Sequence, residues 1–139
     1  MKNFIKNILI SLWKPFSPNP NQDYLFIMGH PRSGSSLLMH ILESNDEIIV
    51  PDYTFVSPIN SIIHSKCKPV LADIDKNNLC ISLNSIKKVA TKNTKAIIIV
   101  HLYGNTPEMN KIINFCKSKK IKIIEDCAEA FGTYYREKH

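Results

Sequence analysis

The stretch KAIIIVHLYGNTPEMNKIINFCKSKKIKIIED, residues 95–126, contains two strand-like runs with a helical segment between them. The run AIIIV is apolar without alternation, which is typical of a parallel strand covered on both faces. The segment TPEMNKIINFCKSKK, 106–120, has apolar residues at helical spacing, with Thr106 as the expected N-cap and Pro107 at the first helical position. The stretch therefore predicts a strand–helix–strand unit whose helix buries Met109, Ile112, Ile113 and Cys116.

The same alternation of strands and helices extends over the chain from Tyr24 onward. Further strand-like runs are YLFIMG, EIIVP and KPVLADI, and further helical segments are expected over 33–45, 56–66 and 82–90. Five strands alternating with four helices indicate βαβ units. The predicted fold is a doubly wound, mostly parallel α/β sheet of about five strands. In such sheets ligands bind beyond the carboxyl ends of the strands.

The composition is that of an ordinary globular domain. The chain has 139 residues, of which 44% are hydrophobic and 22% charged, enough for one domain with a sizeable core. The net charge of +6 comes from scattered lysines and the run KSKKIK, 117–122, with no basic stripe interleaved with aromatics. We therefore expect solvated lysine faces that attract small anions, and no nucleic-acid partner.

The cysteines and the N-terminal residues indicate a cytoplasmic protein. The four cysteines form no C-x-x-C pair, and the five histidines are scattered, so we expect reduced thiols and no metal site. The apolar residues of MKNFIKNILISLWKPF are too few and too interrupted for a stable membrane span or a signal peptide. We interpret residues 1–23 as an N-terminal segment that ends in a linker.

The loop GHPRSGSS, from Gly29 to Ser36, follows the first strand and has the G-x-x-x-x-G spacing of a phosphate-binding loop. Ser35 stands where a nucleotide-hydrolysing P-loop would have lysine. A turn between a strand and a helix gathers free backbone N–H groups that bind phosphate or sulfate, and Arg32 adds a forked charged contact. A capped turn without a ligand would favour the same residue types, so both interpretations stay open.

The residues around this loop resemble one known family. The run FIMGHPRSGSSLLMHILESN resembles the start of sulfotransferases, over about residues 24–45. Their P-R-S-G-[ST]-S loop binds the 5′-phosphosulfate of the donor PAPS. The resemblance implies an α/β unit with a P-loop-like beginning. Its donor-binding positions would be Arg32, Ser33, Gly34, Ser35 and Ser36.

The chain after about Asp46 resembles a different family. The segments DEIIVPDYTFVSPINSIIHSKCKPVLADID and TKAIIIVHLYGNTPEMNKIINFCKSKKIKIIEDCAEAFGTYY contain several motifs of the DegT/DnrJ/EryC1/StrS sugar aminotransferases in the right order. This resemblance covers about residues 46–136. It implies part of the large domain of a type I pyridoxal 5′-phosphate (PLP) aminotransferase, which aminates keto-sugar nucleotides in polysaccharide biosynthesis.

The second resemblance implies three cofactor-binding residues. Asp126 would face the pyridinium nitrogen of PLP, which keeps the ring protonated as an electron sink. Glu129 occupies the position where members carry Gln, His or Glu facing the cofactor, and glutamate there is typical of the perosamine-synthase-like branch. Phe55 matches the aromatic residue that packs on the ring. His101 and Tyr103 match a further motif of the family, and their role there could be either packing or catalysis. From the residues alone, IIED could equally be a capped turn, and Phe55 could be a core residue.

Two segments expected of the aminotransferase family are not recognised. The lysine that binds PLP covalently would follow the EDCAEAFG motif, and Lys138 lies too close to it and lacks the serine–phenylalanine context. The phosphate-binding G-T-x-A-L segment is expected before DEIIVP, where the GHPRSGSS block stands. We therefore expect three regions: 1–23, a sulfotransferase-like unit at 24–45, and a truncated aminotransferase-like region at 46–139, joined near Asn45 and Asp46.

Three hypotheses about the function follow from these resemblances. The first is a sugar-aminotransferase region that has no catalytic residue of its own and is inactive alone, unless a second copy or a partner chain completes the site. The second is a small PAPS- or anion-binding α/β module. The third is a non-catalytic remnant. A nucleotide sugar or another anionic small molecule is the expected ligand.

Overall fold

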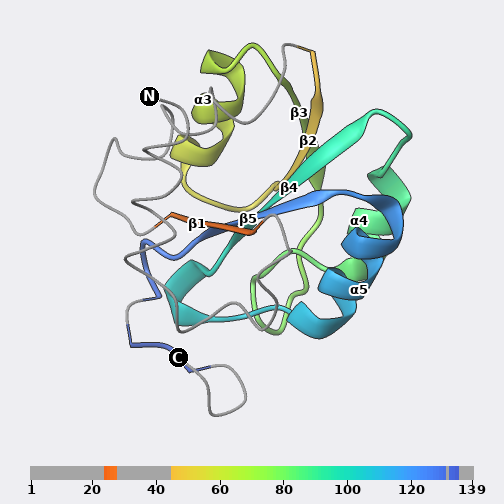
Figure 1. Cartoon of the computed structure of the whole chain (residues 1–139). Coiled ribbons are helices and arrows are strands. Elements are labelled where there is room, and N and C mark those ends of the chain that lie inside the picture. The colour runs from red at the N-terminus through yellow and green to blue at the C-terminus, as the bar shows by residue number, and fades with distance from the viewer. Residues whose placement is uncertain (1–23, 28–44, 131, 135–139) are drawn as a thin grey trace.

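A computed structural model of the chain describes residues 24–27, 45–130 and 132–134, and its core is a parallel sheet (Figure 1). The strands lie in the order β1-β5-β4-β2-β3, and every neighbouring pair is parallel. This confirms the predicted α/β fold and the five predicted strands. The strands are β1 Tyr24–Ile27, β2 Glu47–Pro51, β3 Lys68–Ala72, β4 Thr94–Val100 and β5 Lys122–Asp126.

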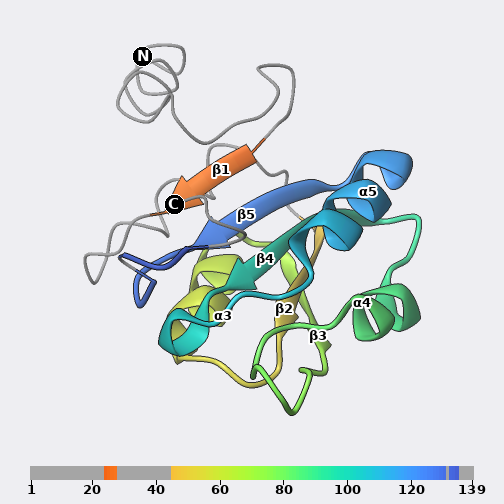
Figure 2. The same cartoon turned by 90° about the horizontal axis from the view of Figure 1, so that it is seen from below.

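Helices cover both faces of the sheet, as a doubly wound fold requires. Helix α3 lies on one face, and α4 and α5 lie on the other (Figures 1 and 2). Alternating strand residues separate two cores: Ile97 packs in the core beneath α4 and α5, and its neighbour Ile98 packs in the core beneath α3. The helices are α3 Val56–His64, α4 Leu83–Val89 and α5 Met109–Lys119, with a short 3-10 helix η1 Leu102–Gly104.

The strand order places a crossover point between β2 and β4. From β2 the chain passes through α3 to β3 at the sheet edge, and it then returns through α4 on the opposite face to β4. Where the connections from two neighbouring strands run to opposite faces of the sheet, a crevice forms at the carboxyl ends of these strands. Ligands of open α/β sheets bind in this crevice. The segments that follow β2 and β4 are therefore the expected walls of a site.

Helix α5 begins later than the sequence predicts. Its first residue is Met109 and its N-cap is Glu108, which makes no side-chain cap bond, so the prediction of Thr106 as N-cap was wrong. The chain makes a three-residue turn just before the helix: Glu108 has φ −69 and ψ 67, and the Met109 N–H donates to the Pro107 carbonyl at 2.7 Å. The buried stripe is confirmed for Met109, Ile112 and Cys116, while Ile113 is partly buried.

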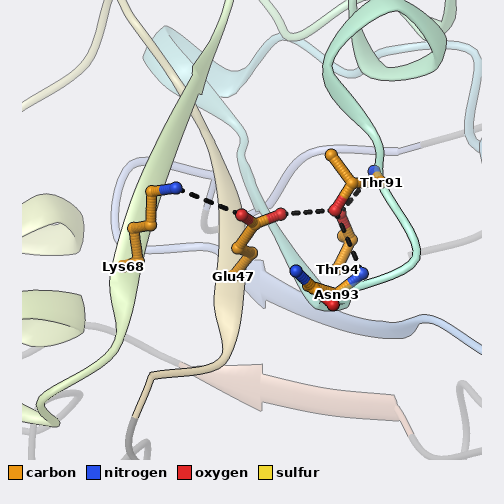
Figure 3. A network of polar contacts seen from close by, with 5 residues as sticks. All are labelled: Glu47, Lys68, Thr91, Asn93 and Thr94. Carbon is orange, nitrogen blue, oxygen red and sulfur yellow. Dashed lines mark hydrogen bonds and ion pairs between the residues drawn. The ribbon is translucent and has the colours of Figure 1, made fainter.

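A polar network ties together the amino ends of β2, β3 and β4 (Figure 3). Glu47 is buried and accepts hydrogen bonds from the Thr91 hydroxyl and from Lys68 Nζ at 3.2 Å. The Thr91 hydroxyl in turn accepts the Asn93 N–H at 3.0 Å, and Thr94 Oγ1 accepts the Thr91 N–H at 2.9 Å. The hydrogen bonds from Thr91 and Lys68 hold the pKa of Glu47 below its ordinary value of 4.5.

We expect Glu47→Gln to lower the melting temperature of the chain by about 2–4 °C at pH 7. A carboxylate whose pKa is depressed by folding stabilises above its unfolded pKa and loses that effect as pH falls through the folded value. The difference from wild type should therefore shrink below pH 4.5. Thermal unfolding at pH 7 and about pH 3 measures this effect. Glu108→Gln, which breaks the exposed pair with Lys111, is the control and should change little. An equal loss at both pH values would contradict the prediction.

Within the described ranges, no helix is long and apolar enough to cross a membrane. The expectations for residues 1–23 and for a helix over 33–45 fall on residues outside the described part, so they stay predictions.

Candidate functional site

The carboxyl ends of β1, β5 and β4 meet at one edge of the sheet. Asp126, the last residue of β5, is in register with Ile27 of β1 on one side and with Val100 of β4 on the other. The next N–H of the β4 chain, that of His101, donates to the Asp126 carbonyl at 3.0 Å. The sequence-predicted Asp126 therefore lies at the edge where a ligand of this fold is expected.

Asp126 carries a half-buried carboxyl group at this edge. Its Oδ1 accepts the N–H of Ala128 at 3.1 Å, which orients the carboxyl group. Burial raises the pKa of Asp126; the Ala128 hydrogen bond and the charge of His101 oppose this shift, and the nearby Glu129 adds to it. A carboxyl group whose pKa is raised by burial gains from a cationic partner, because the opposite charge favours its ionised form. The arrangement suits a contact with a positively charged ligand atom.

Glu129 has a structural partner that the sequence did not reveal. Its Oε2 accepts the backbone N–H of Tyr103 at 3.0 Å, so the segment after β5 is tied to the turn after β4. Tyr103 has φ 54 and ψ 27, the left-handed region, which is strained for a bulky residue. The Glu129 carboxylate thus helps to hold this turn. The predicted contact of Glu129 with the cofactor is not tested by this geometry and stays a prediction.

Aromatic side chains lie exposed on the segments after β2 and β4. Tyr53 and Tyr103 are 50% and 66% exposed. The proximity of Tyr53 and a hydrogen bond between the two side chains raise the pKa of Tyr103. Phe55 is 70% exposed and is the N-cap residue of α3. Its interpretation as a core residue is therefore wrong, and its ring is available to a ligand.

A buried hydrogen bond between two side chains, missed by the sequence reasoning, lies one residue from Asp126. His101 Nε2 and Glu125 Oε2 are 2.8 Å apart, and both residues are over nine-tenths buried. The contact gives His101 a structural partner, and the choice between packing and catalysis at this position is not decided by it. A signal was present in the sequence: a glutamate directly after the apolar pair Ile123 and Ile124 has to be paired when the strand is buried.

Three possible metal ligands lie close together here, but we assign no metal to them. The ligand atoms of His101, Glu125 and Cys127 lie within 4.8 Å of one another. Burial, followed by the charges of Glu125 and Asp126, raises the pKa of Cys127 to about 12. The thiol is therefore protonated at neutral pH, whereas metals bind the thiolate. The sequence-based expectation of no metal site stays a prediction.

The predicted phosphate-binding residues Arg32, Ser33, Gly34, Ser35 and Ser36 lie outside the described residues. Their position in the chain is informative all the same. They follow β1, and the last residue of β1, Ile27, is in register with Asp126. Strand β1 thus ends at the edge of the sheet that carries Asp126.

Comparisons with known proteins agree with this geometry. The model of the DegT/DnrJ/EryC1/StrS aminotransferase family matches residues 33–139. The chain is 38% identical to the GDP-perosamine synthase of Escherichia coli O157:H7 over 104 residues. This alignment covers 75% of this chain and 29% of that protein. The family match includes Ser33 to Ser36, which by resemblance we attributed to a sulfotransferase-like unit.

Solved structures of related proteins share the fold. The aminotransferase from Psychrobacter cryohalolentis superposes with a TM-score of 0.68 at 35% identity, covering 73% of this chain and 25% of that one. The E. coli GDP-4-keto-6-deoxy-D-mannose-3-dehydratase with bound hydrated PLP gives a TM-score of 0.68 at 30% identity. This superposition covers 76% of this chain and 30% of the dehydratase chain. The chain therefore spans about three-tenths of the length of these relatives.

The family match covers most of the chain, and it includes the strand that carries Asp126 and the segments that carry Phe55 and Glu129. The fold of the chain is shared with both solved structures, one of which, the E. coli dehydratase, has hydrated PLP bound. On these grounds the chain belongs to the DegT/DnrJ/EryC1/StrS aminotransferase family.

Proposed function

We propose that this chain provides part of the active site of a PLP-dependent sugar-nucleotide aminotransferase, which aminates a keto sugar in polysaccharide biosynthesis. The observation that carries the proposal is the half-buried carboxyl group of Asp126 at the carboxyl end of β5, inside the family match. PLP, when bound, supplies the electron sink for such chemistry. The relative named GDP-perosamine synthase supports a nucleotide sugar as the substrate class.

Asp126 would hold the protonated ring nitrogen of the cofactor. Burial raises the pKa of this carboxyl group, and a pyridinium cation in contact would favour its ionised form. The Ala128 N–H donates a hydrogen bond to Oδ1 of Asp126, which fixes the orientation of the carboxyl group. The exposed ring of Phe55 offers a flat apolar surface of the kind that packs on an aromatic cofactor.

The phosphate of the cofactor would be bound by the loop that follows β1. The family match includes residues 34–38, GSSLL, whose glycine, serine and leucine pattern is similar to the G-T-x-A-L segment of the family and supports this proposal. Hydroxyl and backbone N–H groups at the start of a helix bind phosphate well. We therefore propose that Ser33, Gly34, Ser35 and Ser36 bind the PLP phosphate rather than PAPS.

The site would need residues beyond those recognised in these 139. On the family resemblance, the lysine that binds PLP covalently follows the EDCAEAFG motif, and no lysine in the recognised context is present. We infer that a further polypeptide segment, one that carries this lysine, completes the site. The 139-residue chain alone would then be inactive.

A chimera tests the proposal. The segment of this chain that matches the E. coli O157:H7 GDP-perosamine synthase would replace the 104 matched residues of that enzyme. We expect the folded chimera to retain PLP through gel filtration and to keep measurable GDP-perosamine synthase activity, because the segment supplies equivalent cofactor contacts. Absorbance of the bound cofactor and product formation are the measurements.

The matched control is the 139-residue chain by itself. One charged contact contributes about 1–3 kcal/mol, whereas even a 1 mM dissociation constant requires about 4 kcal/mol. The isolated chain should therefore lose PLP on gel filtration, and borohydride should attach PLP only to scattered lysines. A chimera that folds but neither binds PLP nor forms product would contradict the proposed function. Stoichiometric PLP on the isolated chain would contradict the inference that the site needs a further segment.

A further inference from the structure

The last turns of α4 and α5 and the amino ends of β4 and β5 lie together at one end of the molecule. Between parallel strands the helix runs back against the sheet, so it ends where the next strand begins. The turn from α4 into β4 and the turn from α5 into β5 both lie on the right in Figures 1 and 2. Strands β4 and β5 are neighbours, with Ala96 in register with Lys122. The two turns are therefore parts of one surface.

This surface carries many lysines and lacks acids. The stretches 76–107 and 109–124, which contain both turns, have no aspartate or glutamate. We call its exposed lysines the lysine edge: Lys87, Lys88, Lys92, Lys95, Lys117, Lys119 and Lys120. The lysines that form ion pairs with described residues are Lys68, with Glu47, and Lys111, with Glu108. The positive charge of the lysine edge is therefore not neutralised by the described part of the chain.

The helix dipole explains only part of this concentration. Lys87 and Lys117 lie in the last turns of their helices, where the partial negative charge of the helix end stabilises a cation. Lys92 and Lys95 lie beyond the end of α4, and Lys95 is already in β4. The effect of a helix end is confined to its last turn, so these two lysines need a different explanation.

The opposite edge of the sheet is acidic. Exposed acids follow β2 and β3 and precede α5, and Asp126 and Glu129 lie at and after the end of β5. The described residues thus form a positive end at the amino ends of β4 and β5 and a negative end at the carboxyl ends of the strands. A negatively charged surface attracts the first and repels the second, so it would orient the molecule.

The chemistry of the lysine edge fits a broad anionic surface better than a single anion or a nucleic acid. A single phosphate contacts only a few donors, whereas these lysines extend over the ends of two helices and two strands. No large exposed apolar or aromatic side chain lies on α4, α5, β4 or β5, and the described residues include no arginine. Base stacking and bidentate contacts to bases therefore have no residues here. Lysine ammonium groups are point charges, which suit the diffuse attraction to anionic lipid headgroups.

We propose that the lysine edge binds reversibly to the surface of a bilayer that contains anionic phospholipids. The contact is electrostatic, and no side chain of α4, α5, β4 or β5 enters the hydrocarbon. The edge of the sheet that carries Asp126 then faces away from the lipid. This contact adds a partner surface to the proposed function and does not depend on it.

Vesicle sedimentation with the 139-residue chain tests the proposal. Vesicles of equimolar phosphatidylcholine and phosphatidylglycerol are compared with vesicles of phosphatidylcholine alone. We expect binding to the anionic vesicles only, and loss of this binding in about 0.5 M NaCl, where exposed charges are screened. Lys117→Gln combined with Lys119→Gln should weaken the binding by about 10–30-fold, because each lysine near an anionic membrane contributes to the attraction.

Lys76→Gln combined with Lys111→Gln is the matched control, because it removes the same charge from the opposite edge. It should weaken the binding by less than about threefold, since the attraction falls off within a Debye length of the membrane. Equal losses in the two double variants would overturn the proposal. Unchanged binding in the Lys117 and Lys119 variant would also overturn it, and would assign the binding to another segment.

A second double variant covers the case in which the first does not fold. Lys92→Gln with Lys95→Gln changes no helix residue, and it should weaken the binding to a similar extent. A short DNA duplex that displaces the vesicles at equal phosphate concentration would overturn the proposal and make the lysine edge a nucleic-acid surface. Because no readout involves PLP, an inactive chimera would refute the proposed function and leave the lipid contact standing.

Discussion

Asp126→Asn, introduced into the chimera with GDP-perosamine synthase, is expected to lower kcat/KM by about 10²–10³-fold, the loss usual for one preorganised electrostatic contact. Asparagine keeps the size of the side chain and an oxygen that can accept the Ala128 N–H. It removes the negative charge that would hold the ring nitrogen in its protonated state. Steady-state kinetics and the affinity for PLP, measured by fluorescence, should both show the loss.

Asp73→Asn is the matched control for this prediction. Asp73 is exposed after β3, and its Oδ1 accepts the N–H of Ile74 at 2.8 Å, a bond that asparagine also makes. The control should leave kcat/KM and PLP affinity near those of the unsubstituted chimera. If Asp126→Asn behaved like the control, Asp126 would not be the carboxylate that contacts the cofactor.

Ile97→Ala is expected to lower the free energy of unfolding of the 139-residue chain by about 2–5 kcal/mol. Ile97 lies in the central strand β4, fully buried between Ile49 of β2 and Ile123 of β5. All three belong to the core beneath α4 and α5. The substitution leaves a cavity in the middle of this row, in a domain whose whole stability is typically about 5–15 kcal/mol. Urea unfolding followed by circular dichroism measures the change.

Ile63→Ala is the control with the same chemical change. Ile63 lies on α3 and is 54% exposed. Surface substitutions usually stay within about 0.5 kcal/mol, and alanine is the better helix former. A loss at Ile97 no larger than the loss at Ile63 would contradict the assignment of β4 as the centre of the core.

The sequence was sufficient for the elements of the fold because their signals are local. The uninterrupted run AIIIV predicted the buried strand β4, and the spacing of Met109, Ile112 and Cys116 predicted the buried face of α5. The start of α5 was missed because Thr106 and Pro107 are favourable at a helix start, whereas the chain makes a tight turn at Glu108, where the Met109 N–H donates to the Pro107 carbonyl. The family motifs also picked out Asp126, whose place at the end of a strand follows from the run KIIED alone.

The contacts around Asp126 were decided by the tertiary structure. His101 and Glu125 are 24 residues apart, and Tyr103 and Glu129 are 26 apart, so no periodicity in the sequence links them. They meet because β4 and β5 are neighbours in parallel register, which brings the carboxyl ends of both strands to one edge. The sequence by itself therefore determined the five strands, the helices α3, α4 and α5 apart from the start of α5, and the acid at the end of β5. The strand order and register determined its partners, because a side chain's environment in a sheet comes from the neighbouring strand rather than from its own.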